Sequence, residues 1–441
     1  MDAVKRSLVA IALMACGCST TQQPAEQQKP TASAQVKPKP TAASRVLSPT
    51  PIHEKIRKLN SGPRLKTFPL IPARPRACAQ PGLKTDQMRS VPARQSGWKL
   101  LSVDQKINDI MDVDVAADGA VWAQTVRVVD DDNEKIDIRR WHKGRWSTFE
   151  RPPIGPDSVD AIYAIAAESA RRTWVFGTTA PPGEDDVVSQ MFIGTFEHGH
   201  WDDAVLTDED TRELDWSTVG VASGWAKAGD LVLRWNGQAW LRQSGEPPGG
   251  QPFGQGHDMW ALDGTARSVL RWQGTGWQQL KLPELGTRAL DSVPEPWLTS
   301  VVPYGRDAAW VIGNVGWDMD NEEHDAEAIR ARPVAVRWNG SSWTCTWGPM
   351  HRTFRDAAPD GKGGLWVIAD QEYETSELWH LSGGRWTKEF LPAPAGQSFF
   401  VQKLIKRPGS DEVYAAGHVT GDDLVDGSLS EDHRGALWRT N

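Results

Sequence analysis

The side chains best suited to bind a ligand form an acidic run, Asp318-Met-Asp320-Asn-Glu322. They place carboxylate oxygens at alternating positions, as calcium-binding loops do. The run lacks the glycine and the final glutamate that complete an EF-hand. Asp318, Asp320 and Glu322 are therefore candidate Ca²⁺ ligands, and Ca²⁺ is the one cofactor that the sequence suggests.

No catalytic motif is present. The chain contains no HExxH, GxSxG, phosphate-binding glycine loop or CxxC pair. His198 and His200 flank a glycine in a predicted hairpin, which favours a structural role. The sequence therefore names no catalytic residue and favours binding over catalysis, although catalytic side chains dispersed over distant elements would escape such a search.

The N-terminus has the features of a secretion signal. Lys5 and Arg6 precede the apolar run Leu8–Ala15, which is too short to span a bilayer. The sequence Leu13-Met14-Ala15-Cys16 resembles the lipobox of bacterial lipoproteins. This resemblance implies a signal peptide over residues 1–16 and a lipid on Cys16, with Cys18 as the alternative.

The same resemblance implies a cellular location. A lipidated cysteine would attach the protein to a membrane of the cell envelope, in the periplasm or at the surface. The residue after the cysteine is Gly17 or Ser19 rather than aspartate, which favours the outer membrane over the inner one.

Charge and proline divide the remaining chain. Residues 19–97 contain 12 of the 30 prolines and a net charge of +11, whereas residues 98–441 have a net charge of −20. We therefore predict a disordered basic tether over residues 17–90 and a folded domain over residues 91–441. The tether would either contact an anionic surface or act as a solvated spacer.

The folded domain is a repeat. An aromatic residue and a tryptophan recur five positions apart, as in Trp141-His-Lys-Gly-Arg-Trp146 and Trp235-Asn-Gly-Gln-Ala-Trp240. We interpret each copy as a hairpin. In the Asn-Gly copies we expect a two-residue turn with positive φ at both residues, which places Trp235 opposite Gln238.

A second block, a small or acidic turn followed by tryptophan in an apolar strand, precedes most hairpins, as around Trp122 and Trp310. Each unit then predicts four antiparallel strands, which is typical of a propeller blade. In the first unit the expected strands are residues 110–116, 120–128, 136–142 and 145–150. The fold class is therefore all-β, a β-propeller.

The chain ends set the number of blades. The C-terminus around Trp438 is a third strand without its fourth, and the segment that starts at Trp98 is a fourth strand without its third. Pairing Trp98 with Trp438 closes a ring of seven blades and leaves no open edge at the junction. Eight blades would require a further blade between Trp277 and Trp343.

The repeat resembles bacterial propellers of the "WAVG…HWDGxxW" type, found in secreted proteins of myxobacteria. The resemblance covers nearly all of residues 98–441 and implies the fold, but no common activity. AADGAVW and APDGKGGLW are also similar to motifs of two-component-regulator and tectonin-type propellers. Tectonins bind glycans, so this second similarity implies a glycan-binding alternative.

Acidic insertions fall in the loops between second and third strands, which emerge on one face of a propeller. That face would either dock a cationic partner or Ca²⁺, or simply maintain solubility. The acidic body excludes nucleic acid as the expected partner. We expect a monomer whose partners are an envelope protein or a glycan.

An oxidising compartment permits disulfides. Cys78 lies in the predicted tether and Cys345 in a strand of the fifth blade. They would either form a bond that joins the tether to that blade or remain free thiols. The sequence thus favours an anchored, non-enzymatic propeller that presents an interaction surface. Glycan- or Ca²⁺-dependent ligand binding is the alternative, and a propeller lyase or glycosidase is the further alternative.

Overall fold

Every regular element of the protein is a β-strand within the part of the chain that the structure describes. The computed structural model describes residues 56–57, 60–79, 91–95, 97–130, 133–149, 161–179, 190–206, 220–222, 224–228, 231–244, 250–255, 258–265, 267–286, 295–305, 307–317, 330–371, 375–421 and 432–441. None of these segments is an apolar helix long enough to cross a membrane.

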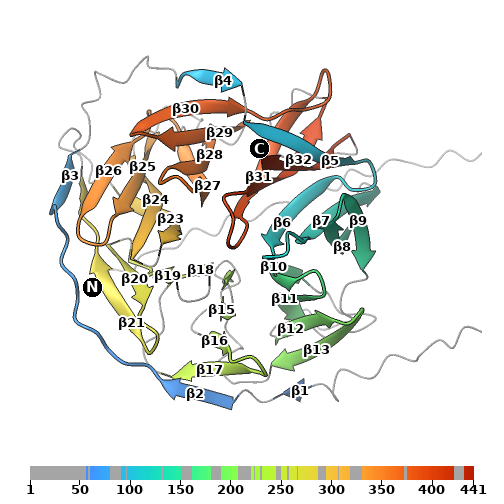
Figure 1. Ribbon diagram of the computed structural model, residues 1–441, viewed down its shortest axis with the longest axis horizontal. Coiled ribbons are helices and arrows are strands. Elements are labelled where there is room, and N and C mark those ends of the chain that lie inside the picture. Colours follow the sequence, from blue (N-terminus) through green and yellow to red (C-terminus); the bar gives the residue numbers. More distant parts are fainter. Residues whose placement is uncertain are drawn as a thin grey trace, which may run out of the picture. The chain divides into compact units, whose positions relative to one another are not determined.

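Seven antiparallel sheets of four strands stand around a ring, which confirms the predicted seven-bladed β-propeller (Figure 1). Blade one is β6 (Asp109–Val115), β7 (Val121–Asp130), β8 (Asn133–His142) and β9 (Arg145–Phe149). Blade two is β10 (Ala161–Ser169), β11 (Arg172–Thr179), β12 (Gln190–Glu197) and β13 (His200–Leu206). Blade three is β14 (Gly220–Ala222), β15 (Trp225–Ala228), β16 (Leu231–Trp235) and β17 (Trp240–Ser244).

The remaining blades continue in chain order. Blade four is β18 (Pro252–Gln255), β19 (Asp258–Leu262), β20 (Ser268–Trp272) and β21 (Trp277–Lys281). Blade five is β23 (Glu295–Gly305), β24 (Ala308–Trp317), β25 (Arg330–Trp338) and β26 (Trp343–Trp347). Blade six is β27 (Thr353–Pro359), β28 (Leu365–Gln371), β29 (Thr375–Ser382) and β30 (Arg385–Phe390).

Blade seven joins the two ends of the ring. It contains β31 (Ser398–Lys406), β32 (Val413–Thr420), β33 (Arg434–Thr440) and, from the other end of the propeller, β5 (Trp98–Asp104). β33 and β5 are antiparallel, with Trp438 opposite Leu100 and Thr440 opposite Trp98. The predicted closure of the ring by the N-terminal strand is therefore confirmed.

The tryptophans of the second strands pack between blades. Trp122 and Trp260 are fully buried and Trp310 is almost so. Four of these tryptophans lie directly opposite an arginine of the third strand. In each pair the guanidinium carbon lies 5.3–5.9 Å from the ring centre, a cation–π distance. These pairs are Trp122 with Arg140, Trp225 with Arg234, Trp260 with Arg271 and Trp310 with Arg337. Burial of these indoles agrees with a packing role.

The hairpins differ from the predicted register. Trp235 lies opposite Trp240, not opposite Gln238, and the two rings are 5.6 Å apart. The central turn residues are therefore Gly237 and Gln238, and of these two only Gly237 has a positive φ. Asn236 instead accepts two backbone N–H bonds with its side chain. Contact between the two aromatic rings fixes the register, and glycine then takes the first central turn position.

The segment before β5 runs along the outer rim of the ring (Figure 1). We call its described residues between 56 and 95 the belt. β1 (Ile56–Arg57), β2 (Asn60–Arg64) and β4 (Ala93–Gln95) pair in parallel with the outer strands of blades two, three and six. Ile71 bridges to Leu280 in blade four, and β3 (Ala77–Ala79) pairs with β22 (Glu284–Gly286).

Residues 60–79, which the prediction assigned to a disordered tether over residues 17–90, are instead part of the belt, whereas most of the rest of that segment lies outside the described residues. Each outer strand has an unpaired edge, and an added strand satisfies its backbone groups. Apolar residues interspersed among the prolines, Ala73 and Cys78, are buried against the blades. Proline is tolerated because an edge strand uses only half of its N–H groups for pairing.

Candidate binding site in the central channel

The innermost strand of each blade lines a central channel. Residues of β6, β10, β14, β18, β23, β27 and β31 surround a cavity of about 530 Å³. These are the first strands of their blades, and the order of strands in each sheet places the first strand at one edge and the last at the other. The cavity is within the size range of small-molecule sites.

Seven charged residues line this channel, and four of them interact as one cluster; the other three are Asp258, Lys406 and Arg407. Asp112 and Asp114 come from β6, Asp356 from β27 and Lys403 from β31. The alternation of a strand explains the first two, because residues two apart share a face. Val113 and Val115, between and after them, are buried in the core. Blades one, six and seven thus contribute to one polar cluster.

Each aspartate also links its blade to the next. Asp112 Oδ2 accepts the Ile165 N–H at 3.1 Å, and Asp114 Oδ2 accepts the Ala167 N–H at 2.7 Å, both from β10 of blade two. Asp356 Oδ2 accepts the Leu404 N–H at 2.8 Å, from β31 of blade seven. These bonds hold the carboxylates in place, and their remaining lone pairs are available to other partners.

Burial and neighbouring charges shift the pKa values of three side chains in this cluster. Burial raises the pKa of Asp114 to about 7, against the lowering effect of the Ala167 and Val115 N–H groups. Burial also raises the pKa of Asp112, although the charge of Lys403 opposes it. Asp356, followed by Asp112 and Asp114, raises the pKa of Lys403 despite its desolvation. At neutral pH the channel therefore holds a charged lysine, with Asp114 close to half protonated.

Replacing Asp114 with asparagine should change how stability depends on pH. The native carboxyl keeps its proton up to about pH 7, whereas the unfolded one releases it near its ordinary pKa of 3.8. Between these pKa values the native state binds more protons, so raising the pH lowers the free energy of unfolding. In Asp114→Asn this contribution is absent, and the amide oxygen still accepts a backbone N–H.

Urea unfolding at pH 5, 6.5 and 8 measures this effect. We expect the wild-type chain to lose more unfolding free energy from pH 5 to pH 8 than Asp114→Asn loses. Parallel pH curves for the two proteins would show that Asp114 is not titrating abnormally.

The cluster was not found from the sequence. Its signal is Asp112-x-Asp114, two acids at strand spacing in a first strand where apolar residues are expected. Among the residues described, no three histidine, cysteine, aspartate or glutamate side chains are grouped as metal ligands.

The predicted closure residues are brought together. Trp98 and Trp438 belong to one core cluster at the junction of blades six and seven and are 3% and 0% exposed. The Trp438 indole N–H donates to the Pro392 carbonyl at 2.8 Å. His198 lies at the tip of the hairpin between β12 and β13, where its positive φ of 53° is part of the turn.

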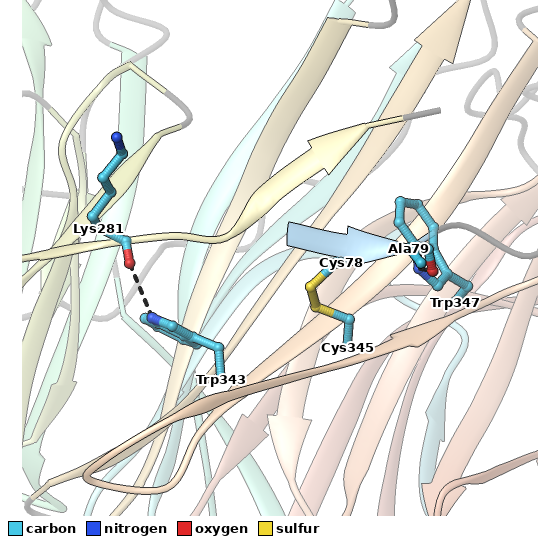
Figure 2. Close-up of a disulfide and its surroundings, with 6 residues drawn as sticks. All are labelled: Cys78, Ala79, Lys281, Trp343, Cys345 and Trp347. Atoms are coloured by element: carbon cyan, nitrogen blue, oxygen red, sulfur yellow. Dashed lines mark hydrogen bonds between the residues drawn. A yellow bond between two sulfur atoms is a disulfide. The ribbon is translucent and has the colours of Figure 1, made fainter. Parts of the chain in front are cut away.

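Cys78 and Cys345 form a disulfide between the belt and blade five (Figure 2). Their Cα atoms are 6.0 Å apart, although 267 positions separate them in sequence. Beside the bond, the Trp347 indole N–H donates to the Ala79 carbonyl at 3.1 Å (Figure 2). Of the two alternatives left open by the sequence, the structure therefore contains the bonded one.

Other predicted residues lie outside the described part of the chain. These are the candidate lipidation sites Cys16 and Cys18 and the candidate Ca²⁺ ligands Asp318, Asp320 and Glu322. Most of the acidic insertions also lie there.

Comparisons with known proteins bear on the fold alone. No protein-family model matches the chain, and no curated protein matches it. Among solved structures, it is similar to the GH93 α-L-arabinofuranosidase of Fusarium graminearum in complex with arabinobiose, at 9% identity and a TM-score of 0.37 over 78% of this chain and 98% of that one. It is also similar to a variant of the Aleuria aurantia lectin in complex with α-methyl-L-fucoside, at 13% identity and a TM-score of 0.28 over 65% of this chain and 79% of that one.

Proposed function

We propose that the protein is a binding propeller, held at an envelope membrane by a lipid on Cys16, and that its central channel takes a small polar ligand. The observation behind the proposal is the channel cavity of about 530 Å³ with Asp112, Asp114, Asp356 and Lys403 in its wall. Ligand sites are concave and place a few polar groups in fixed positions. Backbone hydrogen bonds from neighbouring blades fix the three aspartates in this way.

Lys403 gives the proposal a specific residue to test. Its ammonium group offers donors to the hydroxyl or carbonyl oxygens of a ligand, and the aspartates offer acceptors to ligand hydroxyl or amino groups. In Lys403→Met the side chain keeps a similar length but loses the charge. Ligand binding should therefore weaken, while exposed Lys99→Met, on the outer strand of blade seven, should bind as the wild type does.

A thermal-shift screen of the full chain tests this prediction. Envelope sugars, amino acids and Ca²⁺ are the probes. A ligand at 100 times its Kd stabilises the native state by about 2.7 kcal/mol, which is readily measured. We expect at least one compound to raise Tm in the wild type and in Lys99→Met. The same compound should bind to Lys403→Met at least tenfold more weakly. No shift with any probe, or an equal shift in all three proteins, contradicts the channel site; turnover of the compound would make the protein an enzyme.

The anchor is tested by membrane fractionation. Cys16→Ser should move the protein out of the membrane fraction, whereas Cys18→Ser should leave it there. The reverse result would assign the lipid to Cys18, and no change in either variant would remove the lipid anchor from the proposal.

A further inference from the structure

The belt shows that the outer edges of these blades accept an extended strand. It lies against the outer side of blades two to six in turn. β1, β2 and β4 run parallel to the outer strands that they cover. Among the described residues, the outer strands of blades two, three and six each have an added fifth strand. The outer strands of blades four and five, β21 and β26, have only isolated backbone contacts with the belt, and those of blades one and seven, β9 and β5, have neither.

The belt uses the same backbone positions from blade to blade. The Trp343 N–H, on the first residue of its outer strand, donates to the Arg74 carbonyl at 2.7 Å. The residue two positions after the hairpin tryptophan is used twice. In blade six the Lys388 N–H, two residues after Trp386, donates to Pro92 at 2.8 Å. In blade four the Gln279 carbonyl accepts the Ile71 N–H at 2.9 Å.

In blade one the same positions have no added strand among the residues that the structure describes. The aligned pairs Trp141–Trp146, Trp338–Trp343 and Leu381–Trp386 set the correspondence between blades. Trp146 thus corresponds to Trp343, and Thr148 corresponds to Lys388 and Gln279. Within the described ranges, the backbone groups of Trp146 and Thr148 that point away from β8 have no partner, and Thr148 is exposed.

The outer edges of β5 and β9 differ in the features that prevent pairing with another chain. β5 contains a bulge in its pairing with β33, and exposed Lys99 lies on it. Bulges and lysines are devices that stop a sheet edge from pairing with another chain. β9 pairs with β8 in continuous register from Phe149 to Arg145, so its edge remains regular.

We propose that the outer edge of β9 accepts an extended, basic segment of a partner protein as a parallel fifth strand. The chemistry of this occupant follows from the belt, which continues the same rim. Residues 60–79 contain Arg64, Lys66, Arg74 and Arg76 and no acidic residue, whereas residues 98–441 have a net charge of −20. A basic strand is therefore complementary to the body, and backbone pairing with a sheet edge supplies affinity. This surface is separate from the channel.

The test uses a fluorescent peptide with the sequence of residues 60–66, Asn-Ser-Gly-Pro-Arg-Leu-Lys, added to the full chain. Fluorescence anisotropy should show saturable binding. Thr148→Pro removes the outward N–H without touching the β8 ladder, so it should weaken binding at least tenfold while Tm stays within a few degrees of the wild type. Thr148→Val keeps the N–H and should bind normally. A peptide with glutamate in place of arginine and lysine should bind at least tenfold more weakly.

Three results overturn the proposal. The peptide does not bind the full chain, or it binds equally to the wild type and Thr148→Pro. Alternatively, the chain self-associates through an edge that Thr148→Pro disrupts and excludes the peptide, in which case a second copy is the occupant.

Discussion

Replacing Trp438 with alanine is expected to lower the free energy of unfolding by about 3–5 kcal/mol, the range for removal of a fully buried large aromatic side chain. The side chain is 0% exposed and packs in the cluster that contains Trp98 and Trp366. Its indole N–H donates to Pro392 at 2.8 Å, so truncation also leaves that carbonyl without this donor. Because β33 and β5 close the ring, we expect the loss of stability to be greatest at the junction of these two strands.

Urea denaturation of the full chain measures the change, with Trp260→Ala as the control. Trp260 is equally buried but lies inside blade four, away from the junction. Both variants should be destabilised, but only Trp438→Ala should become more sensitive to trypsin at Arg94 and Lys99, next to and within β5. A loss below about 1 kcal/mol, or equal protease sensitivity in the two variants, would argue against ring closure as the role of Trp438.

Removing the disulfide is the second large change. Cys345→Ser should lower the free energy of unfolding by about 2–5 kcal/mol, because the bond closes a long loop and restricts the unfolded chain. The two cysteines are 267 positions apart, and Cys78 is buried beside blade five. We also expect the belt near β3 to exchange its amide hydrogens faster, since the bond joins it to β26.

A double-mutant comparison separates the bond from the side chains. Cys78→Ser, Cys345→Ser and the double variant should have equal stability, and a reductant should bring the wild type to the same level without affecting the variants. If the single variants were as stable as the oxidised wild type, the bond would contribute nothing to the fold. If their losses added in the double variant, the two side chains would act independently of the bond.

The blades could be predicted because the interactions that define each one are local. Trp141 pairs with Trp146 across a two-residue turn, and the strands of a blade follow each other along the chain, so the repeat is visible directly in the sequence. The same holds for closure, since Trp98 and Trp438 stand in incomplete units at the ends of the propeller. Even here the hairpin register was wrong at Trp235, because ring-to-ring contact outweighed the preference of Asn-Gly for the centre of a turn.

The belt depended on the tertiary structure. Proline and basic charge gave residues 60–79 the composition of a disordered segment, and composition contains no information about an edge elsewhere in the chain. Asn60 pairs with Leu241, and Ala93 with Lys388, across gaps that only the assembled ring brings together. Folding of the blades creates the unpaired edges, and those edges in turn order the belt.

The candidate site depended on the tertiary structure for the same reason. Asp112 and Asp114 look like ordinary polar positions in a strand, and Lys403 lies almost 300 residues further along. They meet because blades one, six and seven are neighbours around the ring, and burial there raises the pKa of Asp114 to about 7. The sequence by itself determined the repeated sheets and their closure through local pairing. The ring alone decided which edges are covered and which charges share the channel, because both follow from contacts between residues that are distant in the chain.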